Sequence, residues 1–208
     1  MRNLKDLIKK AQELKEDGLS TGEISDELNV SRETALWLIT YKEKKEGKIP
    51  ADIYIDWSAI AASEPRLESV AAAMTDLIVE TLREEVDGLD VVVGIATSGI
   101  PLATLIAQEL GTSLAIVKPK KHLWMPKHGR KNEGHLLTNF ADVNGKTVVL
   151  VDDIVTTGST IKDTVKLLKE AGAKPLAAVV LIDKKGISKV GDTPVKALIE
   201  VGIVEEMG

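Results

Sequence analysis

The sequence contains no cysteine, which excludes disulfides, thiol catalysis and cysteine-based zinc sites and favours a cytoplasmic location. No apolar run reaches the roughly 18 residues that a membrane-spanning helix needs, so we expect no membrane association. The first residues alternate charged and apolar side chains and lack the continuous apolar centre of a signal peptide, so nothing in them predicts export. The 208 residues, 44% of them hydrophobic and 28% charged, are typical of a soluble globular protein of one or two domains.

A strong excess of basic charge is also lacking. The net charge is −5, and the first 50 residues carry ten basic and ten acidic side chains. A protein that holds nucleic acid by charge alone needs a clear basic excess. Any contact with nucleic acid must therefore come from one local face.

The hydrophobic pattern changes along the chain. Residues 1–48 show three segments with helical spacing, and from residue 65 onward long helices alternate with short buried strands, which is typical of a mostly parallel sheet. We therefore expect an α/β protein with an all-α domain at 1–48, a linker or edge segment at 49–64, and a sheet flanked by helices at 65–208. In the second part we expect helices at about 65–86, 101–110 and 161–171, and strands at 90–96, 114–117, 146–151, 176–182 and 196–201.

The first domain has the layout of a helix-turn-helix. Ser20 and Glu23 have the spacing of a capping box, Asn29 tolerates the left-handed turn, and Ser31 can cap a third helix that fades toward Gly47. The apolar positions of that helix are Ala35, Leu36, Leu38 and Ile39.

In a helix-turn-helix the start of the second helix enters the major groove of duplex DNA. The residues predicted to contact DNA are Ser31, Arg32, Glu33 and Thr34 at the groove and Lys42, Lys44 and Lys45 at phosphates. Such modules usually read paired half-sites, so a homodimer is expected. A helical bundle that serves only packing or dimerisation is the alternative, and the balanced charge favours it.

A predicted buried strand ends in two acids, Asp152 and Asp153, and is followed by a loop rich in hydroxyls. The residues of this loop, called the phosphate loop below, are Thr156, Thr157, Gly158, Ser159 and Thr160. They offer hydroxyls and amides at the positive end of a helix, which is a favourable place for a phosphate. The neighbouring acids would repel a bare anion, so they indicate a ligand with hydroxyls or a divalent cation. A ribose 5-phosphate meets that demand.

The segment VLVDDIVTTGST, residues 149–160, resembles the signature of the type I phosphoribosyltransferases for phosphoribosyl diphosphate (PRPP), and the resemblance extends over about residues 54–202. It implies that the acids hold the ribose hydroxyls and that the phosphate loop holds the 5-phosphate. It also implies Mg²⁺, brought by PRPP near Asp152 and Asp153, with no protein side chain as a direct ligand.

A second family element lies at residues 91–103. The resemblance implies that Thr97, Ser98 and Gly99, called the pyrophosphate loop below, bind the pyrophosphate through backbone amides. A plain strand-to-helix turn is the alternative. A nucleotide-hydrolysing Walker A loop does not fit, because Ile100 and Pro101 stand where Lys and Ser or Thr are needed.

The long polar stretch 118–134 occupies the place of the family's catalytic loop, where basic groups neutralise the departing pyrophosphate. If the protein is an enzyme, the candidate catalytic residues are Lys118, Lys127 and His128. Whether it is one stays open, because the Arg-Lys pair of the orotate enzymes is replaced here by Lys118 and Pro119.

A further departure follows the strand at 176–182. Where orotate phosphoribosyltransferases carry an Arg that grips the substrate carboxylate, this chain has Lys184, a point charge without a bidentate fork. Together with the N-terminal unit, this resembles the archaeal orotate phosphoribosyltransferase-like transcriptional regulators of the GfcR type. The resemblance implies a regulator that binds double-stranded DNA and senses PRPP or a related phosphorylated metabolite. The alternative is an active orotate- or purine-type phosphoribosyltransferase.

Overall fold

The computed structural model describes residues 4–41, 50–119 and 134–202. Its contacts divide the chain into two compact units, residues 1–58 and 59–208. Within the described ranges, no helix combines the length and the apolar character needed to cross a bilayer.

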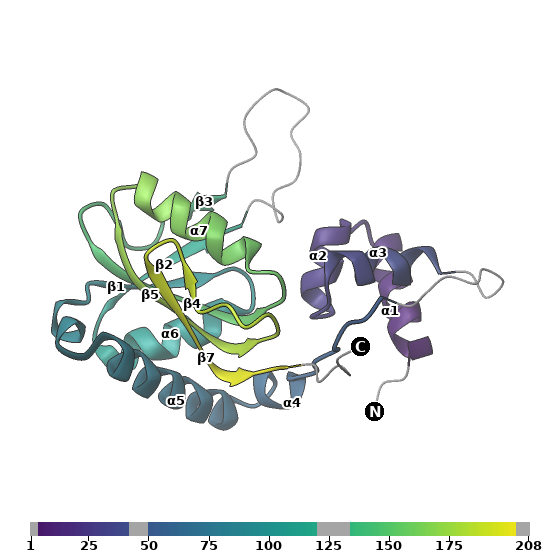
Figure 1. Cartoon of the computed structure of the whole chain (residues 1–208), viewed down its shortest axis with the longest axis horizontal. Helices are drawn as coiled ribbons and strands as arrows, with labels where there is room; N and C mark the ends of the chain where they lie inside the picture. The colour runs from purple at the N-terminus through teal and green to yellow at the C-terminus, as the bar shows by residue number, and fades with distance from the viewer. Residues whose placement is uncertain (1–3, 42–49, 120–133, 203–208) are drawn as a thin grey trace, which may run out of the picture. The chain divides into compact units, whose positions relative to one another are not determined.

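The first unit is built from three helices, α1 (Leu4–Glu16), α2 (Thr21–Glu27) and α3 (Arg32–Thr40) (Figure 1). The predicted capping box is present, because the Glu23 amide donates to Ser20 Oγ and the Ser20 amide donates to Glu23 Oε2. Asn29 has the predicted left-handed conformation, with φ of 54°. The core of this unit consists of the buried residues Leu7, Ala11, Leu14, Ile24, Leu28, Val30, Ala35 and Leu38.

Two expectations for the third helix are wrong. The helix ends at Thr40 rather than near Gly47, because Tyr41 has the non-helical ψ of 129°. Leu36, expected on the apolar face, is 53% exposed. Each residue turns an α-helix by about 100°, so the side that packs Ala35 and Leu38 inward turns Leu36 outward.

The segment that follows the first three helices packs on them. The Ser31 amide donates to Asp52 Oδ2 at 2.6 Å, and the Asn29 side chain donates to the Ile55 carbonyl at 3.2 Å. Tyr54 packs against the helical core. Residues 50–57 form no strand, so of the two interpretations of this segment the edge strand does not occur.

The second unit contains a seven-stranded sheet in the order β3-β2-β1-β4-β5-β7-β6. The central strands β2, β1, β4, β5 and β7 run parallel, and β3 and β6 pair antiparallel at the edges. The strands are β1 (Val91–Ile95), β2 (Ser113–Lys118), β3 (His135–Leu136), β4 (Thr147–Val155), β5 (Lys174–Asp183), β6 (Lys189–Val190) and β7 (Thr193–Glu200).

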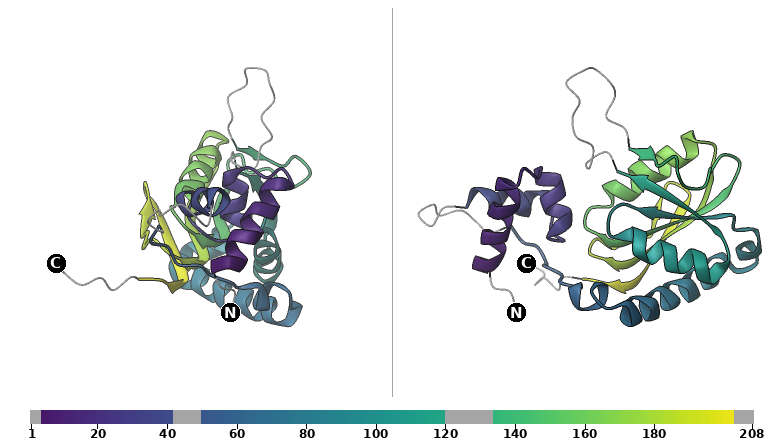
Figure 2. Two further views of the ribbon diagram at one scale, coloured as in Figure 1. Left: turned by 90° about the vertical axis from the view of Figure 1, so that its right-hand side faces the viewer. Right: turned by 180° about the vertical axis from the view of Figure 1, so that it is seen from behind.

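Helices cover both faces of this sheet. The helices α5 (Glu64–Leu82) and α6 (Gly99–Leu110) lie on one face and α7 (Ser159–Glu170) lies on the other (Figures 1 and 2). The short α4 (Ser58–Ala61) precedes α5, and the 3-10 helix η1 (Arg83–Gly88) follows it. The predicted mostly parallel sheet flanked by helices is thus confirmed.

The central strands are mostly apolar because both faces of the sheet are covered. All five residues of β1 are buried. Val91, Val93 and Ile95 belong to the core cluster that contains the α7 residues Ile161, Val165 and Leu168, and α6 packs against β1 and β4 from the other side. This two-sided burial explains the continuous apolar runs, which differ from the alternation of a half-exposed sheet.

Candidate functional site

Strands β1 and β4 are neighbours in the sheet, but the chain leaves them in opposite directions along the sheet. From β1 the chain continues through α6 to β2, whereas from β4, the other neighbour of β1, it continues through α7 to β5. In open α/β sheets, ligands bind outside the carboxyl ends of the strands at such a switch point. The pyrophosphate loop and the phosphate loop follow these two strands.

Gly99 lets the pyrophosphate loop lie close to the acids of β4. It begins α6, and a side-chain carbon on it would lie 2.6 Å from the Val151 carbonyl oxygen and 3.1 Å from the Asp152 Cα. Because those are backbone atoms of a central strand, no flexible side chain can yield to make room. A residue without a Cβ therefore lets the start of α6 approach the end of β4, where the two acids lie.

We predict that Gly99→Ala moves the start of α6 away from β4. The overpacking should cost roughly 1–3 kcal/mol and lower Tm by about 2–4 °C per kcal/mol for a chain of this size. The PRPP binding that the sequence predicts should weaken as well, because the pyrophosphate loop shifts with the helix. Thermal unfolding and calorimetry measure both effects. Gly88→Ala, where an added Cβ meets nothing within 4 Å, is the matched control, and an equal effect of the two substitutions would contradict the prediction.

The two acids lie inside β4 and do not follow it, which corrects the predicted strand end at 151. The strand runs on to Val155, and the side chains of Asp152 and Asp153 are buried, with exposed fractions of 9% and 6%. The Asp153 amide donates to Asp152 Oδ1 at 3.0 Å. Burial raises the pKa of Asp153 above its usual value. Hydrogen bonds with the Ile154 amide and the Ser98 side chain lower this pKa, but the effect of burial is larger. The Ser98 contact links the pyrophosphate loop to the acids.

The raised pKa of Asp153 predicts a pH-dependent stability. The folded protein keeps this proton to a higher pH than the unfolded chain, so the stabilisation is complete below the usual pKa of 3.8 and is lost as pH rises through the folded value. Asp153→Asn cannot ionise, and we expect its Tm to exceed that of the wild type at pH 7. Melting curves from pH 4 to 8 should show this gap widening with pH. A gap that stays constant would contradict the prediction.

The phosphate loop is shorter than predicted, because α7 begins at Ser159 rather than Ile161. Gly158 precedes the helix with φ of 76°, a conformation that favours glycine. The hydroxyls of Thr157 and Ser159 lie 3.0 Å apart at the surface. The N-cap residues of α6 and α7, Ser98 and Gly158, make no side-chain cap hydrogen bond, whereas Ser20 and Ser31 cap α2 and α3. In α7 the Ser159 amide donates to Thr157 Oγ1 at 3.5 Å. The first turns of α6 and α7 thus offer amides that can donate hydrogen bonds to an anion.

Asp183 is a residue of this region whose structural role the sequence reasoning missed. It ends β5, is 3% exposed, and accepts hydrogen bonds from the amides of Lys185, Gly186 and Ile187 at 2.7, 3.0 and 2.6 Å. The Lys184 amide donates to the Val155 carbonyl at 2.9 Å, which ties this turn to the end of β4. An aspartate followed three residues later by glycine is a common turn signal and was the available clue.

The remaining predicted residues are distributed as follows. Lys118 ends β2 and is half-buried, and Lys127 and His128 lie outside the described residues, as do Lys42, Lys44 and Lys45. At the start of α3, Arg32 and Glu33 are exposed. Ser31 Oγ accepts from the Thr34 amide at 3.1 Å and lies 2.9 Å from Thr34 Oγ1, so these two hydroxyls serve the helix cap.

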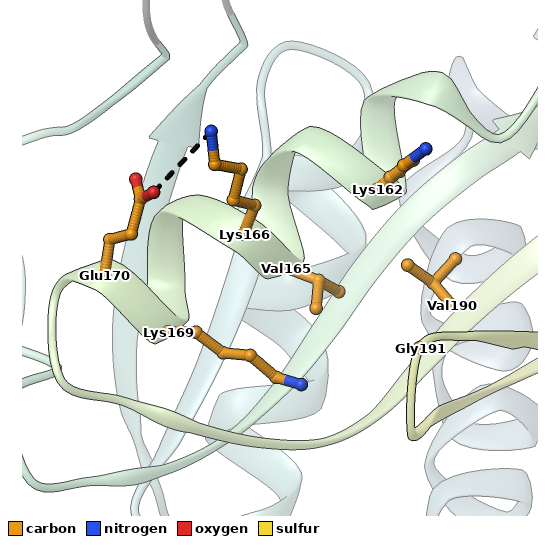
Figure 3. Close-up of a pocket in the computed structure, with 7 residues that line it drawn as sticks. All are labelled: Lys162, Val165, Lys166, Lys169, Glu170, Val190 and Gly191. Atoms are coloured by element: carbon orange, nitrogen blue, oxygen red, sulfur yellow. Dashed lines mark ion pairs between the residues drawn. The ribbon is translucent and has the colours of Figure 1, made fainter.

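A separate depression lies between α7 and the β6–β7 turn, with Val165 and Val190 between lysines (Figure 3). Lys166 forms an ion pair with Glu170 at 3.6 Å. None of the predicted ligand residues lines this depression, so the loops at the switch point remain the candidate site. In the part of the chain that the structure describes, no three His, Asp or Glu side chains are grouped to hold a metal ion.

Comparison with known proteins adds the following. Residues 56–206 match the family model "Phosphoribosyl transferase domain". The chain is 46% identical over 208 residues to a protein of Methanocella arvoryzae named transcriptional regulator GfcR, with 99% of this chain and 100% of that protein covered. A protein of the same name from Methanosarcina mazei is 47% identical over 203 residues, which cover 97% of this chain and 98% of that protein.

Two solved structures share the fold of the second unit. Orotate phosphoribosyltransferase from Aeropyrum pernix is 23% identical with a TM-score of 0.53, covering 72% of this chain and 80% of that one. Adenine phosphoribosyltransferase from Saccharomyces cerevisiae is 22% identical with a TM-score of 0.56, covering 70% of this chain and 85% of that one. At these identities the likeness concerns the fold alone.

Proposed function

The chain belongs to the phosphoribosyl transferase domain family and to the family of the GfcR transcriptional regulators, and from that premise we propose that it binds duplex DNA under the control of PRPP or a related phosphorylated metabolite. It is a transcriptional regulator with a phosphoribosyltransferase domain. The proposal adds the ligand, the residues that bind it and the residues that contact DNA.

The convergence of the two loops on the acids at the switch point is the observation that carries the ligand proposal. The backbone contact of Gly99 with β4 and the Ser98–Asp153 hydrogen bond bring the start of α6 to the two buried carboxylates. The phosphate loop, from which α7 begins, follows the same carboxylates along the chain after the end of β4. A ligand with phosphates and vicinal hydroxyls matches both kinds of group, since amides receive the phosphates and carboxylates receive the hydroxyls. In this proposal the phosphate loop holds the 5-phosphate, the pyrophosphate loop holds the diphosphate, and Asp152 and Asp153 hold the ribose.

The donor set also fits Mg²⁺ carried by the ligand. Magnesium prefers oxygen ligands and usually bridges one or two carboxylates to substrate phosphates. In this proposal the ligand carries the ion near Asp152 and Asp153 without direct ligation by either side chain, and burial makes the charge of Asp153 costly. A bound Mg²⁺ would neutralise the diphosphate, while Asp152 and Asp153 would orient the ribose.

The proposed DNA interface is the exposed start of α3. Arg32 and Glu33 are exposed there, and a capped helix start after a left-handed Asn29 is the arrangement that a helix-turn-helix requires. Arg32 carries the fork that pairs with guanine in the major groove. Because such modules read paired half-sites, the proposed DNA-binding form is a homodimer.

Two measurements on the same preparation distinguish the proposed regulator from the alternative, an active phosphoribosyltransferase. Calorimetry with Mg²⁺-PRPP should show binding to one site per chain. A turnover assay with orotate, adenine, guanine and hypoxanthine should show no release of pyrophosphate above a protein-free control. Binding without turnover supports a sensor. Turnover with one of the bases would make the enzyme the better description, and the lack of PRPP binding would overturn the ligand proposal.

A further inference from the structure

The exposed side of α3 carries one large apolar residue among polar ones. Its exposed residues are Arg32, Glu33, Leu36 and Thr40, which recur at helical spacing on one side. The other apolar side chains of this helix, from Ala35 to Ile39, all belong to the core cluster or pack against it. At 53%, Leu36 has the highest exposed fraction of the large hydrophobic residues that the structure describes.

Leu36 also lies one turn after Arg32, on the side that the proposed function turns toward the DNA groove. Two residues four positions apart on a helix are roughly 6 Å apart along its axis, and successive base pairs are about 3.4 Å apart. A groove-bound α3 would therefore bring Leu36 to a base pair about two steps from the one that Arg32 contacts. Neither the helix cap nor the core uses the Leu36 side chain.

We infer that Leu36 is a specificity-determining residue that contacts the 5-methyl group of thymine. Among the four bases, only thymine presents a methyl group in the major groove, and apolar side chains are its natural partners. The inference rests on the proposed DNA binding and deepens it. It assigns the recognised half-site a guanine read by Arg32 and a thymine about two base pairs away read by Leu36.

The methyl group can be removed from the DNA without changing its sequence. Duplexes that bind the full-length protein are first selected from a random-sequence library, and the selected sequence is then made with either thymine or uracil. Replacement by uracil should weaken wild-type binding by roughly 4-fold for each methyl contact, the factor that burial of one such group provides. Leu36→Ala should bind the thymine duplex as weakly as the wild type binds the uracil duplex, and uracil should change its affinity no further.

Ile199→Ala, another exposed apolar residue at 49% but in the second unit, is the matched control and should respond to uracil as the wild type does. Equal sensitivity of Leu36→Ala and wild type to uracil would overturn the inference while leaving DNA binding intact. Loss of self-association in Leu36→Ala, measured by sedimentation, would also overturn it, because Leu36 would then contact a second copy. If no sequence is selected at all, the proposed function itself fails.

Discussion

Replacement of both Asp152 and Asp153 by asparagine is expected to abolish the response of DNA binding to Mg²⁺-PRPP and to leave DNA affinity without ligand unchanged. Each carboxylate accepts a ribose hydroxyl in the proposed site, and a hydrogen bond to a charged group contributes about 1.5–3 kcal/mol. Loss of two such bonds should weaken PRPP binding by roughly 100-fold or more. Calorimetry measures the ligand affinity and fluorescence anisotropy measures the DNA affinity.

The control for this double variant is Asp163→Asn combined with Asp192→Asn, which removes the same charge from exposed positions of the same unit. That variant should keep the ligand response. Because the buried carboxylate of Asp153 is costly in the folded protein, the double variant should not melt below the wild type. If the variant with asparagine at positions 152 and 153 also lost DNA binding, or kept its ligand response, the proposed coupling between ligand binding and DNA binding would be wrong.

Arg32→Glu is expected to have the second large effect, on DNA binding alone. A bidentate arginine–guanine contact discriminates against the wrong base by about 1–3 kcal/mol, and a carboxylate in its place also repels phosphates. Specific affinity should therefore fall by at least roughly 10-fold at moderate salt, while PRPP affinity and Tm stay at the wild-type values. Anisotropy titrations with specific and random duplexes at one stated salt concentration measure this.

Arg66→Glu, at the start of α5 in the second unit, makes the same charge change and should leave DNA affinity unchanged. Equal losses for both variants would mean that net charge and not base contact governs binding. No loss for Arg32→Glu would assign the first unit to packing or dimerisation, the alternative that its balanced charge favoured.

Local signals were enough to predict most elements of both units. The Ser20–Glu23 box, the left-handed Asn29 and the Ser31 cap depend on residues within three or four positions of one another, so the sequence alone shows them. The five parallel strands were largely evident because burial on both faces makes most of their residues apolar, whereas the two-residue edge strands β3 and β6 were not predicted. Strand β4 was cut short at 151 because two consecutive acids read as a strand end, whereas in the sheet they continue the ladder beside β5.

What the sequence could not show depends on contacts between distant segments. Whether Leu36 or Trp37 faces the core is decided by where α1 and α2 pack, since both are apolar and adjacent. The role of Gly99 appears only when β4 lies beside β1, and Asp183 becomes a turn-forming residue only once it ends a buried strand. The sequence could nominate the candidate ligand residues, but the placement of β1 beside β4 at the switch point required the strand order.

A single titration can decide whether this protein is a ligand-responsive DNA-binding regulator. The full-length protein is titrated by fluorescence anisotropy against duplex DNA from upstream of its own gene, at fixed salt, with and without Mg²⁺-PRPP, and with excess random duplex as competitor. We expect competitor-resistant binding whose affinity changes when Mg²⁺-PRPP is added. Binding that competitor removes, or that is the same with and without PRPP, would contradict this expectation.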